Sequence, residues 1–294
     1  MTSKAFPGGS RLPWLVLAAL ACGCGGSALI RGDDVAYRRS LEHFKRTRQM
    51  VAASLAPDDD QAMFLQAEGL FRYRFAPPGK SFGSYLAQAA ASATDLPVLD
   101  SLAGALDLYS LRLRTYDGAV QLWETLLARD PATPLGPLAR YRLGWAYRNS
   151  IASGLPRDSD QAFDALVASD PGSPLAPLAA AARRAPWKSM DRATAWSIVP
   201  GLGQIYAGEI KNGSVRLAIA VVAAGMVVVP GIVAFERRDD LSWHRDWPLL
   251  VTSIAGAIIV TTDYSSSYQD ALRAVLEYNE RSEAAFEDAH PDAP

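Results

Sequence analysis

The chain has 294 residues, of which 49% are hydrophobic and 20% charged, so a disordered chain is excluded over most of its length. Its 29 basic and 31 acidic residues give a net charge of −2, which argues against a dedicated nucleic-acid-binding protein. Two cysteines are too few for a disulfide scaffold or a cysteine-based zinc site.

The first segment, residues 1–24, has the pattern of an export signal. Basic residues precede a short apolar run, Leu12–Ala21, and small residues lead into Cys22 and Cys24. Such an order is typical of a secretory signal peptide, and the run is too short to span a bilayer core of about 30 Å. The segment also resembles a bacterial lipobox, which implies lipid attachment at Cys22 or Cys24. Ordinary cleavage after Ala21, an uncleaved anchor and a redox pair of cysteines stay open as alternatives.

The middle of the chain has a helical pattern almost throughout. We expect N-terminal helices over residues 31–94 and helical repeats over residues 95–188. Apolar residues recur at steps of three and four residues, as they do at Leu102, Leu106, Tyr109 and Leu113. Since no stretch alternates long enough to form a strand, the sequence predicts an all-α fold.

An internal repeat lies within this helical region. The segment 130–139 recurs as 170–179, an offset of 40 residues. Each copy begins with Asp-Pro, which should end one helix because the residue before proline is driven out of the α region. Thr133 and Ser173 then offer N-cap oxygens to the next helix, with a proline at its first position. Each copy therefore predicts a helical hairpin that must stack on its neighbours to bury its apolar face.

Small and aromatic residues follow a common spacing on these helices, at Ala119, Trp123, Leu126, Ala139, Tyr141, Gly144, Tyr147 and Phe163. This pattern resembles the tetratricopeptide repeat (TPR) of cell-envelope lipoproteins over residues 95–186. The resemblance implies that small residues allow close helix crossing while aromatic residues fill the space between hairpins. It also implies a protein or peptide partner in the concave groove of the array. The offset of 40 residues exceeds the usual 34, so an unrelated helical bundle stays the alternative.

A glycine-rich motif follows, formed by Pro200, Gly201, Gly203, Gln204, Tyr206 and Gly208. It resembles the P-G-x-G-Q-x-Y-x-G signature of small bacterial two-span membrane domains of the TM2 and DUF5683 type, over about residues 190–275. The proline is expected to break the preceding helix and the glycines to allow a tight turn. Gln204 and Tyr206 are then expected at the level of the lipid headgroups. A re-entrant element or a ligand site is the alternative to this structural turn.

Two apolar stretches predict a transmembrane helical hairpin. Val215–Phe235 carries a single charge, Arg216, and at 1.5 Å per residue it is about 31 Å long, which matches a bilayer core. Trp247–Thr262 is shorter and begins with an interfacial tryptophan. Small residues in both stretches would allow close packing in lipid, and buried helices of a soluble core are the alternative. Residues 276–294 are expected to complete a C-terminal helix and end in a frayed tail.

No constellation of catalytic residues stands out along the chain. The three histidines lie in unrelated contexts, and no nucleophile elbow or phosphate-binding loop is found. Residues 58–60 are three aspartates, which we interpret as the acidic first turn of a helix, with a cation site as the alternative. We therefore expect no enzyme activity, no cofactor and no resident metal.

The order of these segments leads to a functional expectation. We expect a TPR-like helical array followed by a transmembrane hairpin, acting as a membrane-anchored cell-envelope scaffold. An accessory subunit of an envelope transport, secretion or protein-insertion system is the alternative. The expected partners are membrane lipids and a protein or peptide, but not nucleic acid. An exported N-terminus places the repeats in the periplasm of a bacterial inner-membrane protein, while an outer-membrane lipoprotein stays the alternative.

Overall fold

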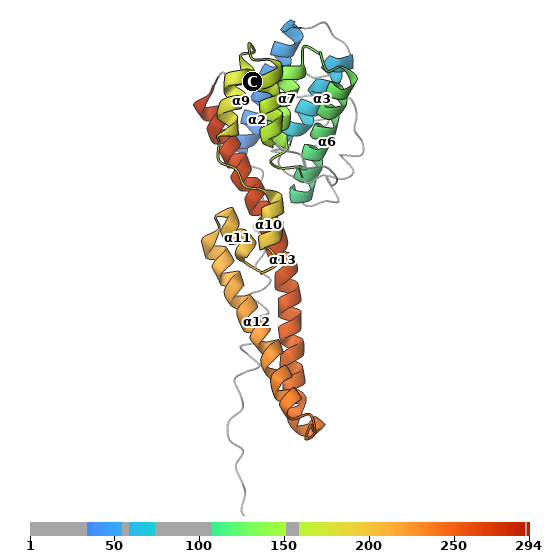
Figure 1. Ribbon diagram of the computed structural model, residues 1–294, viewed down its shortest axis with the longest axis vertical. Coiled ribbons are helices and arrows are strands. Elements are labelled where there is room, and N and C mark those ends of the chain that lie inside the picture. The colour runs from blue at the N-terminus through green and yellow to red at the C-terminus, as the bar shows by residue number, and fades with distance from the viewer. Residues whose placement is uncertain (1–33, 55–58, 74–107, 151–158, 292) are drawn as a thin grey trace, which may run out of the picture. The chain divides into compact units, whose positions relative to one another are not determined.

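The computed structural model describes residues 34–54, 59–73, 108–150, 159–291 and 293–294. Within these ranges the chain forms ten helices and no strand, which confirms the predicted all-α class (Figure 1). The lipidation candidates Cys22 and Cys24 lie outside the described residues.

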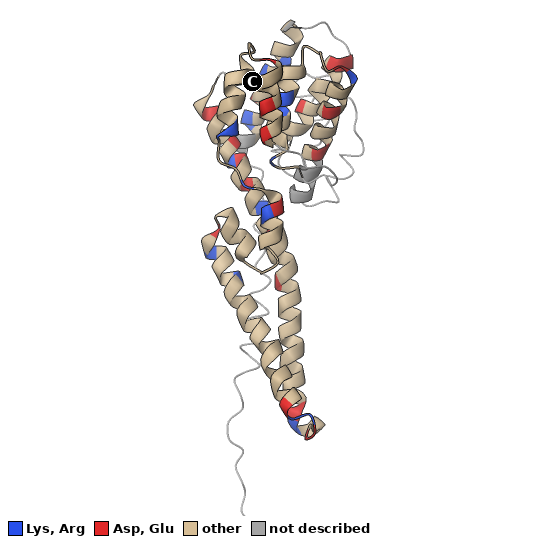
Figure 2. Ribbon diagram, viewed as in Figure 1, with Lys and Arg blue, Asp and Glu red and all other residues tan. Residues whose placement is uncertain are grey.

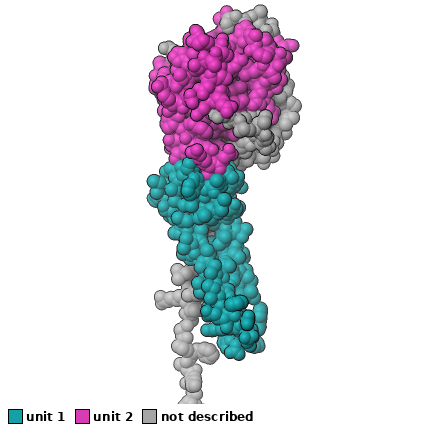
Figure 3. Space-filling model, viewed as in Figure 1, with its two compact units in different colours: residues 1–29, 194–272 teal, residues 30–193, 273–294 magenta. Residues whose placement is uncertain are grey.

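The described residues form two compact units that are interleaved along the chain (Figure 3). The first, which we call the repeat unit, combines residues 30–193 with residues 273–294. The second, which we call the hairpin unit, has residues 194–272 as its described part. The chain thus leaves the repeat unit after residue 193 and re-enters it at residue 273.

The repeat unit is an array in which successive helices pack against one another. Its helices before the hairpin unit are α2 (Asp34–Ser54), α3 (Asp59–Tyr73), α6 (Leu108–Arg129), α7 (Gly136–Ala146), α8 (Ser159–Ser169) and α9 (Leu175–Arg183). The end of α13 (Trp243–Ala289) completes the unit, and α10 (Met190–Trp196) contains the change from one unit to the other along the chain.

The offset of 40 residues appears in the structure as two equivalent helical hairpins. Helix α6 ends at Arg129 and α8 ends at Ser169, and each is followed by a tight turn. In these turns the Asp130 carbonyl accepts a hydrogen bond from the Thr133 amide at 3.2 Å, and Asp170 accepts the equivalent bond at 3.0 Å. The predicted stop-and-start segment is therefore a real turn in both copies.

The starts of the helices after these turns differ from the prediction. Helix α7 begins at Gly136 and has no side-chain cap, because Leu135 occupies its N-cap position. In the other copy, the Ser173 hydroxyl does accept a hydrogen bond from the Leu175 amide at 3.2 Å. Pro174 is the N-cap residue of α9, so neither helix is capped by the predicted hydroxyl, and the helices begin one or two residues later than expected.

The hairpin unit contains α11 (Leu202–Ala207), α12 (Ile210–Glu236) and the first part of α13. The predicted apolar stretches lie inside α12 and α13, and both helices are long and apolar enough to cross a membrane. They approach closely at Gly256, where an added β carbon would lie 2.8 Å from the Ala223 carbonyl oxygen. The second apolar stretch continues without a break into the C-terminal helix, so α13 is one helix of 47 residues.

The last residues of the chain are held in place, in contrast to the predicted frayed tail. Arg46 in α2 donates a hydrogen bond to the Pro291 carbonyl at 3.1 Å, and Arg39 lies 3.2 Å from a carboxylate oxygen of Asp288. Ala293 is only 2% exposed. Contacts with α2 therefore fix the tail within the repeat unit.

Candidate functional site

The residues predicted to pack the repeats lie in the core of the repeat unit. Ala119, Trp123 and Leu126 come from α6, and Ala139, Tyr141 and Gly144 come from α7; all six are buried. Phe163 of α8 is fully buried as well, whereas Tyr147 is half-buried and donates a hydrogen bond to Glu124 at 2.9 Å.

Aromatic rings fill the space between these helices, as the repeat resemblance implied. The Trp123 ring lies 5.5 Å from the Phe71 ring and 6.2 Å from the Phe64 ring, so it joins α6 to α3. Phe163 lies 5.9 Å from Trp145 in an edge-on arrangement. Gly144 makes room for this ring, because a β carbon there would lie 2.4 Å from it.

A buried network of charged side chains, which the sequence did not reveal, crosses the same core. We call Glu68, Arg72, Arg142 and Glu287 the ion network. Glu68 accepts a hydrogen bond from Arg72 at 3.1 Å and from Arg142 at 2.7 Å. Arg72 also donates to Glu287 at 2.7 Å. Glu68, Arg72 and Arg142 are almost completely buried, so each charge depends on its partners for stabilisation.

These contacts shift the titration of the groups around Glu287. Burial raises the pKa of Glu287, but the charges of Arg72, His43 and Arg142, together with the hydrogen bond from Arg72, outweigh burial and lower that pKa to about 2. His43 lies 3.9 Å from Glu287, yet burial and the charge of Arg72 lower its pKa to about 4. At neutral pH the carboxylate is therefore charged and the imidazole is neutral. All partners of this network belong to the chain itself, so its chemistry is that of a structural clamp.

The glycine-rich motif forms a compact turn at the start of the hairpin unit. Helix α10 ends at Trp196, and Gly201 and Gly208 flank α11 with left-handed φ angles of 90° and 98°. A β carbon on Gly201 would lie 2.2 Å from the Gly213 carbonyl oxygen, so α11 meets α12 backbone to backbone. The Gly201 amide also donates a hydrogen bond to the Ser267 hydroxyl of α13 at 2.8 Å. The motif thus ties all three helices of this unit together.

The polar residues of the motif lie differently from the prediction. Gln204 is only 2% exposed and packs inside the hairpin unit, although we expected its amide to face lipid headgroups. Its Oε1 atom is buried and has no hydrogen-bond partner. Gly203 is buried and Tyr206 is half-buried. The interior position of Gln204 follows from the short α11, which packs flat against α12.

A second group of polar side chains lies where the apolar stretch of α12 begins and the apolar stretch of α13 ends. We call Arg216 of α12 and Asp263, Ser266 and Asp270 of α13 the Arg216 cluster. Arg216 donates a hydrogen bond to Asp263 at 2.9 Å, to Ser266 at 2.6 Å, and to Asp270. Arg216, the single charge of the first apolar stretch, therefore has its partners in α13. The spacing of 263, 266 and 270 on one helix face was the signal for this pairing.

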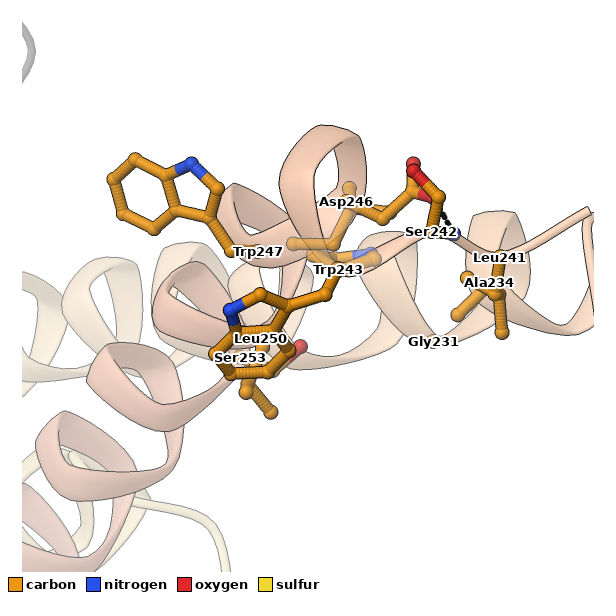
Figure 4. A pocket seen from close by; sticks show the side chains of 11 residues that line it. Gly231, Ala234, Leu241, Ser242, Trp243, Asp246, Trp247, Leu250 and Ser253 are labelled. Carbon is orange, nitrogen blue, oxygen red and sulfur yellow. Dashed lines mark hydrogen bonds between the residues drawn. The ribbon is translucent and has the colours of Figure 1, made fainter.

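An apolar cavity of about 330 Å³ lies where α12 ends and α13 begins (Figure 4). Pro230, Gly231 and Ala234 line it from α12, and Trp243, Trp247 and Leu250 line it from α13. Its charged residue, Asp246, accepts a hydrogen bond from the Ser242 amide at 2.8 Å and another from Arg245 at 3.2 Å. The other polar side chains of the lining are those of Ser242 and Ser253.

In the described part of the chain, neither possible metal ligands nor the threonine hydroxyls of the apolar stretch of α13 form a further site. Its histidine, cysteine and carboxylate side chains form no group of three that could hold a metal ion. Thr261 and Thr262 donate hydrogen bonds to carbonyls of their own helix, at 2.8 and 2.9 Å. These hydroxyls satisfy the backbone locally and need no partner in the neighbouring helix.

Comparison of the chain with models of known protein families, with curated proteins and with solved structures finds no match.

Proposed function

We propose that this chain is a membrane-anchored scaffold of the bacterial cell envelope, with the hairpin unit in the bilayer and the repeat unit in the periplasm. The exposure of the apolar helices is the observation that carries this proposal. Only 11% of the most apolar window of α12 and 6% of that of α13 are buried by the rest of the chain. Helices in the core of a soluble domain would be mostly buried, so a lipid environment accounts better for this surface.

The length of the apolar surface supports the same placement. Phe235 lies nineteen residue steps after Arg216 in α12, and at 1.5 Å per step the distance is about 28 Å, close to the thickness of a bilayer core. No charged residue lies between Arg216 and Glu236 of α12 or between Asp246 and Asp263 of α13, and these stretches are tan in Figure 2. Exposed aromatic residues, Phe235, Trp243 and Trp247, mark the end that carries the cavity. Aromatic rings are enriched at such membrane interfaces.

The distribution of exposed hydrophobic residues separates the two units. Among the described residues, all the exposed large hydrophobic side chains belong to the hairpin unit except Met50 and Trp187. The repeat unit is therefore suited to an aqueous compartment. The export signal expected over residues 1–24 supports the periplasm as that compartment.

The scaffold role rests on the repeats and on the absence of catalytic groups in the sites described above. An array of stacked helical hairpins offers extended surfaces to a protein or peptide, and it needs no cofactor to do so. The accessory role in transport or insertion would be favoured by polar groups exposed between the spans. Because Thr261 and Thr262 bond within their own helix, the scaffold role is the better supported of the two.

The membrane placement can be tested by extraction at alkaline pH. In a variant with Cys22→Ser and Cys24→Ser, no lipid can be attached at these positions. We expect this variant to stay in the membrane pellet after carbonate treatment, because two spans hold it more firmly than an acyl chain. Release into the soluble fraction would contradict the membrane hairpin.

The orientation can be tested by cysteine labelling in the same background. Met50 is an exposed residue of the repeat unit, and Asp239 is an almost fully exposed residue between α12 and α13. In cells with a permeabilised outer membrane, an impermeant maleimide should label Met50→Cys. It should label Asp239→Cys only after the inner membrane is opened. Labelling of Asp239→Cys before the inner membrane is opened, and of Met50→Cys only afterwards, would place the repeats in the cytoplasm. Crosslinking from Met50→Cys would then identify cytoplasmic neighbours.

A further inference from the structure

The last part of α13 is seated inside the repeat unit, although it follows the hairpin unit in the chain. We call residues 273–294 the closing segment. Val275 and Leu276 are fully buried, and the Phe286 ring lies 5.1 Å from the Trp145 ring of α7. The segment thus contributes apolar side chains to the core that the repeats build.

Asn279 fixes the position of this segment through four hydrogen bonds. Its amide nitrogen donates to the Arg148 carbonyl at 3.0 Å, to the Asn149 side chain at 3.0 Å and to the Lys188 carbonyl at 2.9 Å. Its oxygen accepts a bond from the Lys188 amide at 2.8 Å. A buried amide with all these partners specifies one register of the helix.

The closing segment supplies two of the three carboxylates whose charges act on Arg72, namely Glu283 and Glu287, while Glu68 is the third. Without the closing segment, Glu68 alone would face the two buried guanidinium groups of Arg72 and Arg142. An uncompensated buried charge is strongly destabilising, so the repeats depend on the closing segment for more than its apolar area.

Because of the order of segments in the chain, this dependence requires that both apolar helices cross the membrane. Residues 194–272 lie between the repeats and the closing segment, and they contain both apolar helices. We infer that the repeat unit reaches its folded state only after both spans have crossed the membrane, because only then does the closing segment return to the side of the repeats. This inference rests on the proposed membrane hairpin, and it makes the closing segment an internal check on correct insertion.

The decisive variant changes the second span and leaves the repeat unit untouched. Ile254 and Ile258 are exposed positions in the middle of the α13 span, and arginine at both should prevent its insertion. We expect Ile254→Arg/Ile258→Arg to make the repeat unit at least about tenfold more sensitive to protease, since cleavage follows the population of the open form. The matched control, Ile254→Leu/Ile258→Leu, should keep the resistance of the unchanged protein.

A label on the closing segment reports which side it occupies. Ala285 is exposed, so Ala285→Cys can be combined with both sets of span substitutions in a background without Cys22 and Cys24. An impermeant maleimide should label it in the leucine control and not in the arginine variant. Resistant repeats together with a closing segment on the opposite side would overturn the inference. Sensitive repeats with the closing segment still on their own side would overturn it as well.

A second pair of variants tests the contact without disturbing the spans. Glu287→Gln removes the buried charge, whereas Arg281→Gln removes an exposed one whose hydrogen bond goes to the Glu277 carbonyl of its own helix. Protease sensitivity of the repeats should rise in the first and stay unchanged in the second; equal sensitivity of the two would refute the role of the closing segment. Release of the Cys22→Ser/Cys24→Ser protein by carbonate would instead refute the membrane hairpin, and with it the insertion check. The result for Glu287→Gln would not be affected by that outcome.

Discussion

Substituting Gly144 by alanine tests how closely the repeats pack. The added β carbon would lie 2.4 Å from the ring of Phe163, so the ring would have to move by about 1 Å to restore normal contact. The ring has little room, because it is fully buried and lies 6.0 Å from the Tyr141 ring and 5.9 Å from the Trp145 ring. Overpacking of this kind costs about 1–3 kcal/mol. Alanine regains about 1 kcal/mol of helix propensity, which leaves a net loss of up to about 2 kcal/mol.

Gly118→Ala is the matched control for this substitution. Gly118 also lies inside a helix of the repeats, but its β carbon would meet only the end of the Leu70 side chain, at 3.2 Å. We expect this variant to be unchanged or more stable by up to about 1 kcal/mol. Urea unfolding in detergent micelles, followed by tryptophan emission, gives the shift in midpoint at constant slope. A Gly144→Ala protein as stable as Gly118→Ala would refute the packing argument.

Three further predictions concern the hairpin unit and the pH dependence of folding. Gly213→Ala places a β carbon 2.5 Å from the backbone oxygen of Gly201, and we expect a loss of about 1–3 kcal/mol, seen as a lower Tm in micelles. Arg216→Leu leaves the buried Asp263 without its cation and should cost about 3–5 kcal/mol, whereas Arg216→Lys should cost less; equal Tm values for the two would contradict the ion pairing. Because the pKa of Glu287 is lowered to about 2, its carboxylate stabilises the fold above about pH 5, and up to about 3 kcal/mol should be lost as the pH falls to 2. Unfolding titrations of Glu287→Gln should show a flatter pH dependence, and an unchanged one would refute the assignment.

The helical hairpins and apolar spans follow from local sequence signals. The Asp-Pro turns end α6 and α8 at equivalent positions, because a proline restricts the residue before it wherever it stands. The length of an apolar run likewise sets the length of a helix that can cross lipid. Such features need only a few neighbouring residues, and the sequence predicts them well.

The buried charges could not be predicted because their partners are remote. Arg72 and Glu287 are 215 residues apart in the chain, and each by itself has the pattern of a solvent-exposed helix residue. Their pairing depends on the return of the chain after the hairpin unit, which no local period encodes. The same reason explains why a frayed tail was expected where Arg46 holds Pro291.

Helix α13 is longer than its apolar stretch for a different reason. Hydropathy falls after Thr262, but the residues from 263 to 289 include neither proline nor glycine. Nothing in the backbone therefore stops the helix where the apolar surface ends. The boundary of a membrane span and the boundary of a helix are separate properties, and α13 has them at different residues.

The interleaving of the two units has a practical consequence for anyone who wishes to prepare the repeat unit alone. A fragment cut at residue 193 discards Asn279, Phe286 and Glu287, and should aggregate on expression. A version that keeps these residues would need residues 193 and 273 joined by a short glycine-serine linker in place of the excised apolar helices. Binding screens with such a spliced protein would then sample the array together with the C-terminal residues that belong to it.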